Sequence, residues 1–165
     1  MEELSHELER IREIVPEGEL EAEADRGVFW INLPKEALLS VVTLLRDDPQ
    51  LDYKMLSDFF GVDYPARGKR FDLIYNLYSL SRNRRIFLRV RVGENEPVTT
   101  LSGIFPNANW AEREVYDLFG VEFEGHPDLR RLLMPDDWDG HPLRKDYPLI
   151  GKRSILLYND VKDVT

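Results

Sequence analysis

Apolar residues recur at helical spacing in two segments of the N-terminal half of the chain. The first segment, residues 2–15, ends at Pro16 and carries its apolar side chains at Leu4, Leu8, Ile11 and Val15. The second opens at Pro34, stops at Asp47-Asp48-Pro49, and places on one face Ala37, Leu38, Val41, Val42 and Leu45. Proline is typical of helix starts and of the positions just beyond helix ends, so both segments are predicted to be helices.

Alternating apolar and polar residues predict strands. ELEAEA (19–24) and VFWINL (28–33) form a first pair, joined by a turn at Asp25-Arg26-Gly27. FDLIYNLYSL (71–80) and RRIFLRVRV (84–92) form the clearest hairpin of the chain, joined by Ser81-Arg82-Asn83. Residues 51–64 are less regular. LDYKM alternates like a strand, SDFFG looks like a turn or a short helical piece, and VDYP is compatible with a continuation of the sheet.

The second strand of that hairpin has two different faces. Its apolar positions are Ile86, Leu88, Val90 and Val92, and they alternate with Arg85, Phe87, Arg89 and Arg91. One face is therefore expected to be core and the other to be a basic stripe. A solvated sheet face is the ordinary explanation of such a stripe, and a functional surface is the alternative.

Charged and aromatic residues are crowded together in the segment 109–119, NWAEREVYDLF. Asn109 followed three residues later by Glu112 is a capping-box pattern, and Gly120 stands where a left-handed residue commonly ends a helix. A helix over 110–119 is therefore predicted. Its apolar arc contains Ala111, Val115, Leu118 and Phe119.

Glu114 is the informative residue of this helix, because it falls inside the apolar arc between Trp110 and Leu118. A carboxylate on a buried face is unfavourable unless it is paired, so Glu114 is expected to have a structural partner, such as an arginine of the tail. The less favoured alternative is a general acid or base with a raised pKa. Arg113 and Asp117 form an i,i+4 pair on the opposite side, where an exposed pair stabilises little.

Helical and strand periodicity is lost after residue 120. Residues 121–165 contain four prolines and two related stretches, GHPDLRR and GHPLRKD. Such a segment is expected to be an extended or looped tail, and long ordered loops are usually functional or bound to a partner. His126 and His141 each precede a proline in a turn, and no third ligand at suitable spacing supports a metal site, so both are interpreted as turn histidines.

The composition narrows the possible functions. The chain has 165 residues, enough for one domain with its own core, and its 42% hydrophobic and 32% charged residues are ordinary for a soluble protein. No apolar run approaches the roughly 20 residues of a membrane span, and the N-terminus MEELSHELER lacks the apolar region of a signal peptide, so a cytoplasmic chain is expected. A net charge of −9 argues against nucleic acid as a partner. The lack of cysteine excludes disulfides, thiolate nucleophiles and Cys-ligated iron–sulfur clusters.

The stretch EREVYDLFGVEFEGHPDLRRLLMP, followed by GHPLRKDYPL, resembles the hallmark region of the C subunit, or 30 kDa subunit, of NADH-quinone oxidoreductase, respiratory complex I. The likeness is dense over residues 109–149 and extends loosely back through VDYP, the 71–92 hairpin and TTLSGIFPNANW. It implies an α/β (α+β) fold with a mixed or antiparallel sheet flanked by helices, followed by an extended C-terminal tail. Residues 1–120 would form the core with the charged helix 109–119, and residues 121–165 would be a docking tail of the same single domain.

The resemblance also implies a place in a larger enzyme. Members of this family are peripheral-arm subunits without flavin or cluster, so FMN and the Fe–S clusters would lie in partner subunits. The complex passes electrons from NADH through FMN and Fe–S centres to quinone and couples this to proton translocation. The expected partners are the D subunit, next to the quinone site, and the B and I subunits. NADH, quinone and the cytoplasmic side of the cell membrane would be reached only through these partners.

Two sets of alternatives stay open. Related subunits occur in energy-converting hydrogenases, formate hydrogenlyase and F420H2 dehydrogenase, and the motif does not separate them. A stand-alone hydrolase that uses Glu114 or His126 in acid–base chemistry is the less favoured alternative from another class of protein.

The charged helix and the two GHP stretches are accordingly assigned to docking and self-bracing. No catalytic, cofactor-binding or metal-binding residue is expected in this chain. Arg144 and Lys145 are expected to meet acidic groups on a neighbouring subunit, and a proline-rich tail is expected to contribute little to the fold. The motif residues assigned to this surface are Glu112, Arg113, Glu114, Asp117, Phe119, Gly120, His126, Asp128, Arg130, Arg131, His141, Arg144, Lys145, Asp146 and Tyr147.

Overall fold

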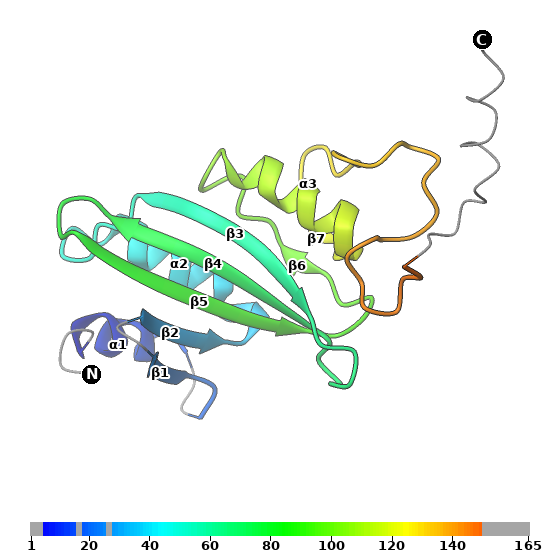
Figure 1. Cartoon of the computed structure of the whole chain (residues 1–165). Helices are drawn as coiled ribbons and strands as arrows, with labels where there is room; N and C mark the ends of the chain where they lie inside the picture. The colour runs from blue at the N-terminus through cyan, green and yellow to red at the C-terminus, as the bar shows by residue number, and fades with distance from the viewer. Residues whose placement is uncertain (1–4, 16–17, 26–27, 150–165) are drawn as a thin grey trace, which may run out of the picture.

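Five strands form one mixed sheet in the computed structural model, which describes residues 5–15, 18–25 and 28–149. The strand order is β1-β2-β5-β4-β3, and all neighbours are antiparallel except β2 and β5, which run parallel (Figure 1). The expected mixed α+β fold is thereby confirmed. The strands are β1 (Glu21–Asp25), β2 (Val28–Leu33), β3 (Met55–Asp63), β4 (Phe71–Ser79) and β5 (Arg84–Val92).

Two helices cover one face of this sheet. α1 (Ser5–Arg12) and α2 (Leu38–Asp47), the latter preceded by the 3₁₀ turn η2 (Lys35–Ala37), pack their apolar sides on the core. Both predicted helices are confirmed within the described residues, and every predicted apolar position of the second is buried. Leu4, Pro16, residues 26–27 of the first hairpin turn and residues 150–165 lie outside the described residues.

The irregular stretch 51–64 contains a single long strand, so the prediction of a turn or short helix at SDFFG is wrong. β3 pairs with β4 over nearly its whole length, with a register shift between Leu56 and Asp58. Because a bulge inserts one extra residue, the apolar alternation is interrupted there and the strand period cannot be followed through it. Beyond the bulge Phe59 stacks on Tyr75 with ring centroids 4.3 Å apart, which anchors the edge strand in the core.

The basic stripe of β5 lies on the sheet face opposite the helices. Ile86, Leu88, Val90 and Val92 are buried as predicted. In the part of the chain that the structure describes, no helix lies over the stripe (Figure 1). Arg85 is exposed, whereas Arg89 is partly buried and donates to Glu23 on β1 at 2.8 Å. The stripe is therefore neutralised in part by acids of the neighbouring strands.

A third helix and a small parallel ribbon lie beyond the β3 edge of the sheet. α3 (Ala108–Phe119) packs against β3, and β6 (Val98–Thr99) pairs with β7 (Phe123–Glu124) beside it (Figure 1). Val121 and Phe123, which follow α3, belong to the same buried cluster as the sheet and helices. The chain from 125 to 149 then crosses the end of α3 without regular structure.

The start of α3 differs from the sequence-based expectation. The helix begins at Ala108, its N-cap is Asn107 without a side-chain hydrogen bond to the helix, and Asn109 lies inside it. The predicted capping box of Asn109 and Glu112 is therefore wrong. Glu112 is instead turned inward, where it holds the chain before the helix. The predicted helix end is confirmed, because Gly120 has a left-handed φ of 76°.

No described helix combines the length and the apolar character that crossing a membrane requires.

Candidate functional site

The carboxyl end of α3 is capped by the loop that follows it in the chain. Helix ends leave their last carbonyls without intrahelical partners. Gly120 N–H satisfies the carbonyl of Tyr116 at 2.8 Å. The next three carbonyls accept from the tail: Asp117 O from His141 Nδ1 at 2.9 Å, Leu118 O from Leu143 N at 3.1 Å, and Phe119 O from Arg144 Nε at 2.6 Å.

Asp117 is the centre of this arrangement. Its side chain is fully buried, and Oδ2 accepts the backbone N–H groups of Leu132, Leu133 and Met134 at 3.0, 2.7 and 2.8 Å. Oδ1 accepts from Arg131 at 2.7 Å. Burial by itself disfavours the charged form, but these donors outweigh it and hold the pKa of Asp117 below its ordinary value. The carboxylate thus fixes the conformation of a whole turn of the tail.

Two arginines complete the bracing by donating to backbone carbonyls. Arg131 reaches from Asp117 to the carbonyls of Trp138 and Gly140 at 2.9 and 3.1 Å. Arg113, which is almost fully buried, donates to the carbonyls of Arg130 and Arg131 at 3.1 and 3.0 Å. A planar guanidinium suits this role because it offers several donors in a fixed fork.

A second cluster fastens the end of the described tail to the β3–β4 turn. Arg70 lies between two carboxylates, donating to Asp63 at 2.7 and 2.9 Å and to Asp146 at 2.9 and 2.7 Å. Hydrogen bonds from Arg70 lower the pKa of both Asp63 and Asp146. The backbone N–H of Lys145 adds a bond to Asp63 at 2.7 Å, and Arg144 pairs with Glu94 at 2.7 Å.

Glu112 has a structural position on the other side of α3. It is completely buried and accepts from the Thr100 hydroxyl and from Leu101 N, the latter at 2.7 Å. Burial raises its pKa, although both donors act against this shift. His126 lies 3.9 Å away, with Nε2 bonded to the carbonyl of Asn109 and Nδ1 accepting from Asp128 N. Both ring nitrogens of His126 are therefore bonded to backbone groups, so this imidazole is not free to act as the acid or base of a hydrolase.

The predicted orientation of the charges on α3 is wrong. Glu114 is exposed, whereas Arg113 and Asp117 are buried. Trp110 and Glu114 of the predicted apolar arc are exposed, whereas Leu118 is partly buried against the core. The tail instead packs over the side of the helix that carries Arg113 and Asp117, and its backbone groups supply the hydrogen bonds that make burial of these charges possible.

The remaining motif residues have smaller parts. The ring of Phe119 contacts that of Phe71 edge to face, with the ring centroids 6.3 Å apart, and Tyr147 stacks with Trp138 at a centroid distance of 6.4 Å. Arg130 forms an exposed ion pair with Asp128, with Nε and Oδ2 2.9 Å apart. Within the described residues, no three Asp, Glu or His side chains are grouped so that they could hold a metal ion.

Sequence reasoning missed Asp63, Arg70 and Glu94. These residues lie outside the charged helix and the GHP stretches, and only folding brings them to the tail. The one local signal is the pair of Asp63 and Arg70 on either side of the β3–β4 turn. An acid and a base flanking a turn are common on protein surfaces, so this signal is weak.

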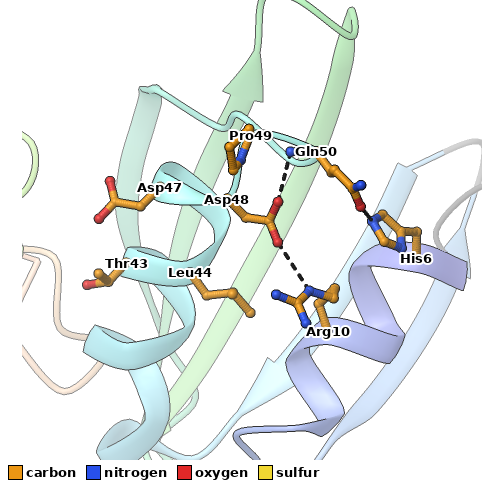
Figure 2. Close-up of a pocket in the computed structure, with 8 residues that line it drawn as sticks. All are labelled: His6, Arg10, Thr43, Leu44, Asp47, Asp48, Pro49 and Gln50. Carbon is orange, nitrogen blue, oxygen red and sulfur yellow. Dashed lines mark hydrogen bonds and ion pairs between the residues drawn. The ribbon is translucent and has the colours of Figure 1, made fainter.

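A separate surface groove of 750 Å³ lies between α1 and the end of α2 (Figure 2). Its polar groups bond mainly to one another: Arg10 Nε donates to Asp48 at 3.1 Å, and His6 bonds to the side chain of Gln50 at 2.8 Å. The N–H of Gln50 and the Arg10 guanidinium lower the pKa of Asp48. These contacts fasten α1 to α2, and we assign the groove a structural role.

Comparisons with known proteins agree with this architecture. Residues 31–153 match the family described as respiratory-chain NADH dehydrogenase, 30 Kd subunit. The C subunit of NADH-quinone oxidoreductase from Roseiflexus sp. is 44% identical over 153 residues, which are 92% of this chain and 88% of that protein. The corresponding subunit from Xanthobacter autotrophicus is 49% identical over 138 residues, 84% of this chain and 66% of that protein.

A solved structure extends the likeness to the fold. A chain of the membrane-bound sulfane sulfur reductase, an archaeal respiratory membrane complex, superposes with a TM-score of 0.72 at 21% identity. The superposition covers 96% of this chain and 91% of the other. At this identity the likeness shows the fold alone. The family match and the relatives above show that the chain belongs to the family of the NADH-quinone oxidoreductase C subunit, the 30 Kd subunit of respiratory-chain NADH dehydrogenase.

Proposed function

We propose that this chain is a non-catalytic structural subunit of the peripheral arm of NADH-quinone oxidoreductase, and that it docks to the D subunit near the quinone site. One observation carries the proposal. The side chains of the family motif are used to cap α3 and to brace the tail, through Asp117, Arg131 and Arg113. Such groups build a rigid surface, and a surface already held in its bound shape loses less conformational entropy when it binds a partner.

The redox chemistry of the complex belongs, in this proposal, to other subunits. The complex passes electrons from NADH through FMN and iron–sulfur centres to quinone and couples this to proton translocation. The sequence has no cysteine, so it offers no thiolate for a cluster. FMN and the clusters are therefore assigned to partner chains, and the B and I subunits are the further neighbours proposed. The protein sits on the cytoplasmic side of the cell membrane and reaches the membrane only through these partners.

The equivalent subunit of a related membrane complex is the second candidate. A chain of the sulfane sulfur reductase, a respiratory membrane complex, shares this fold. The relatives at 44% and 49% identity favour NADH-quinone oxidoreductase.

The proposal is tested with the purified full chain and with membranes from a strain that lacks it. The purified chain is expected to be colourless and to leave NADH unoxidised with ferricyanide as acceptor. The deletion membranes are expected to lose NADH-driven quinone reduction but to keep donor-side NADH oxidation with ferricyanide, and the wild-type chain should restore the first activity. A stoichiometric flavin or cluster in the purified chain would end the structural-subunit proposal.

A further inference from the structure

The outward side of α3 carries an unusual set of side chains. Trp110, Glu114 and Leu118 follow one another at four-residue intervals and so form one stripe along the helix. Trp110 is 61% exposed, although most of its ring surface is apolar. The Arg113 guanidinium lies 5.0 Å from the centroid of the Trp110 ring, but most of this side chain stays exposed. Exposed apolar surface with a polar rim commonly marks an interaction site.

At its Leu118 end, this stripe borders an apolar groove between α3 and β3, here called the α3 groove. It has a volume of 110 Å³ and is lined by Phe59, Phe60, Gly61, Glu114, Val115, Leu118, Phe119 and Leu143. Two of the lining side chains, Phe60 and Leu143, are 37% and 49% exposed. The groove is therefore an open, mostly apolar depression whose wall includes the tail.

Gly61 lines the groove at a point where β3 and α3 lie so close that a side chain would make a tight contact. A Cβ at this position would lie 3.2 Å from Cδ2 of Phe119 and 3.5 Å from Val115, so glycine lets β3 approach α3 closely. Leu143 is held over the groove by the bond from its own N–H to Leu118 O. Both walls are thus fixed by the fold.

The charged groups around the α3 groove indicate what kind of segment it would bind. Glu112, Asp117, Arg131 and Arg144 find their partners inside the chain, as described above. Glu114 is exposed at the groove, and within the described residues no hydrogen bond or ion pair engages its carboxylate. A carboxylate beside an apolar depression is complementary to a cationic group that arrives with an apolar one.

We propose that the α3 groove receives a segment of a partner subunit that inserts one aliphatic side chain and places a Lys or Arg against Glu114. This inference rests on the proposed function, because it names the surface and the chemistry by which the protein docks. The groove volume of 110 Å³ is somewhat smaller than the cavity of about 150 Å³ that accommodates a benzene molecule, so it suits one aliphatic side chain. A second copy of the chain is disfavoured because two molecules of net charge −9 repel one another.

The test uses the complex purified from membranes in which the wild-type chain is replaced by a variant. Glu114→Arg reverses the charge at the rim, and Leu143→Asp places a charge over the apolar wall. Glu9→Arg on α1 and Leu39→Asp on α2, where Leu39 is 40% exposed, are the matched controls. The amount of chain retained per complex after a salt wash is measured for each variant, and the circular dichroism of each purified chain reports its fold.

Both groove variants are expected to lower the retained chain by about tenfold or more, because truncated or reversed central contacts dominate interface energies. Both controls should be retained like the wild type, and all four chains should fold. If Leu143→Asp does not fold, Glu114→Arg alone decides. Groove variants that are retained like the wild type would overturn the inference while leaving the proposed function intact, whereas a wild-type chain that is absent from the complex would overturn the proposed function itself.

A photoreactive amino acid in place of Leu143, in an otherwise unchanged complex, identifies the occupant. The expected crosslink joins a partner subunit at an aliphatic residue next to a Lys or Arg. A crosslink only to a second copy of this chain, to lipid, or to a segment without a basic residue would refute the proposed chemistry.

Discussion

Asp117 and Arg70 show how this protein accommodates buried charge. Each is surrounded by several groups of the opposite polarity rather than by one counter-ion: Asp117 by three N–H groups and Arg131, and Arg70 by Asp63 and Asp146. Burying an ion is unfavourable unless its hydrogen-bonding capacity is filled. Both clusters meet this condition with groups of the tail, so the charges order the tail as much as the tail shields them.

Asp117→Asn is expected to destabilise the chain by about 3 kcal/mol. The NH₂ group of an asparagine would face either the N–H groups of residues 132–134 or the guanidinium of Arg131. All of these groups are donors, so in either orientation a donor would face a donor. Glu114→Gln is the matched control, and it should change stability by less than about 0.5 kcal/mol because Glu114 is exposed. Urea unfolding of the two purified variants measures the difference, and equal effects would contradict the assigned faces of α3.

The sequence interpretation assigned the charged helix to docking and self-bracing, and Asp117 of α3 pairs with Arg131 of the tail. The sequence analysis placed Glu114 inward, whereas Asp117 is the buried carboxylate of the two. Periodicity gives the angle between residues around a helix, but it does not say which side of the helix a distant loop will cover. Trp110 and Leu118 made one arc look like core. Only the path of the tail, which carries no periodicity, decides that this arc is the outer one.

The end of α3 depends on a close fit between Gly120 and the tail. Gly120 has a left-handed backbone, and a Cβ there would lie 2.5 Å from Nε2 of His141. The imidazole occupies this space because its Nδ1 bonds to the carbonyl of Asp117. Burial lowers the pKa of His141, which favours the neutral ring, and the bond to the carbonyl of Asp117 places the ring proton on Nδ1.

Gly120→Ala is expected to lower stability by about 2 kcal/mol, since the substitution adds a left-handed alanine and a contact that His141 must leave. Gly68→Ala is the comparison, because a Cβ at Gly68 meets nothing within 4 Å, and it should be neutral or slightly stabilising. Thermal unfolding of both variants provides the measurement. A Gly120→Ala chain as stable as the wild type would show that the tail does not hold His141 in this place.

Elements with an unbroken period were predicted more accurately than the others. The β4–β5 hairpin has an unbroken pattern and the expected bounds within a residue or two, and the predicted helix that opens at Pro34 corresponds to the turn η2 followed by α2. β3 was predicted only in part. LDYKM was expected to be a strand, but β3 begins at its last residue, Met55, and the bulge near Ser57 breaks the alternation within SDFFG. β6 and β7 were not predicted, because two residues carry no pattern. The start of α3 was misplaced because Glu112 has the spacing of a capping box but bonds to Thr100 and Leu101.

The tail is part of the folded unit as far as Tyr147, which stacks with Trp138. Val121 and Phe123 belong to the core, and the segment beyond them bonds to α3, to the β3–β4 turn and to Glu94. The expectation that the tail adds little to the fold rested on its prolines and lack of periodicity. Those features exclude helix and strand, but they do not exclude a loop whose side chains and backbone groups bond to the rest of the chain.

Arg144 and Lys145 are therefore expected to have different roles, although they are adjacent and both basic. Arg144 is largely buried and bonds to Phe119 O and Glu94 within the chain, whereas the side chain of Lys145 is exposed. Arg144→Glu should lower stability by about 2 kcal/mol, because it removes the cap of α3 and places two carboxylates together. Lys145→Glu should leave stability unchanged within about 0.5 kcal/mol.

Urea midpoints of the two single variants test the first role, and co-purification with the proposed partner, the D subunit, tests the second. If Lys145 meets an acidic group of the partner, Lys145→Glu lowers co-purification while its urea midpoint stays at the wild-type value. Arg144→Glu would lower both quantities together, because a loosened tail no longer presents Leu143 at the α3 groove. An Arg144→Glu chain with the wild-type midpoint would contradict the bracing role. A Lys145→Glu chain that co-purifies normally would remove Lys145 from the docking surface and leave the groove beside Glu114 as the proposed contact.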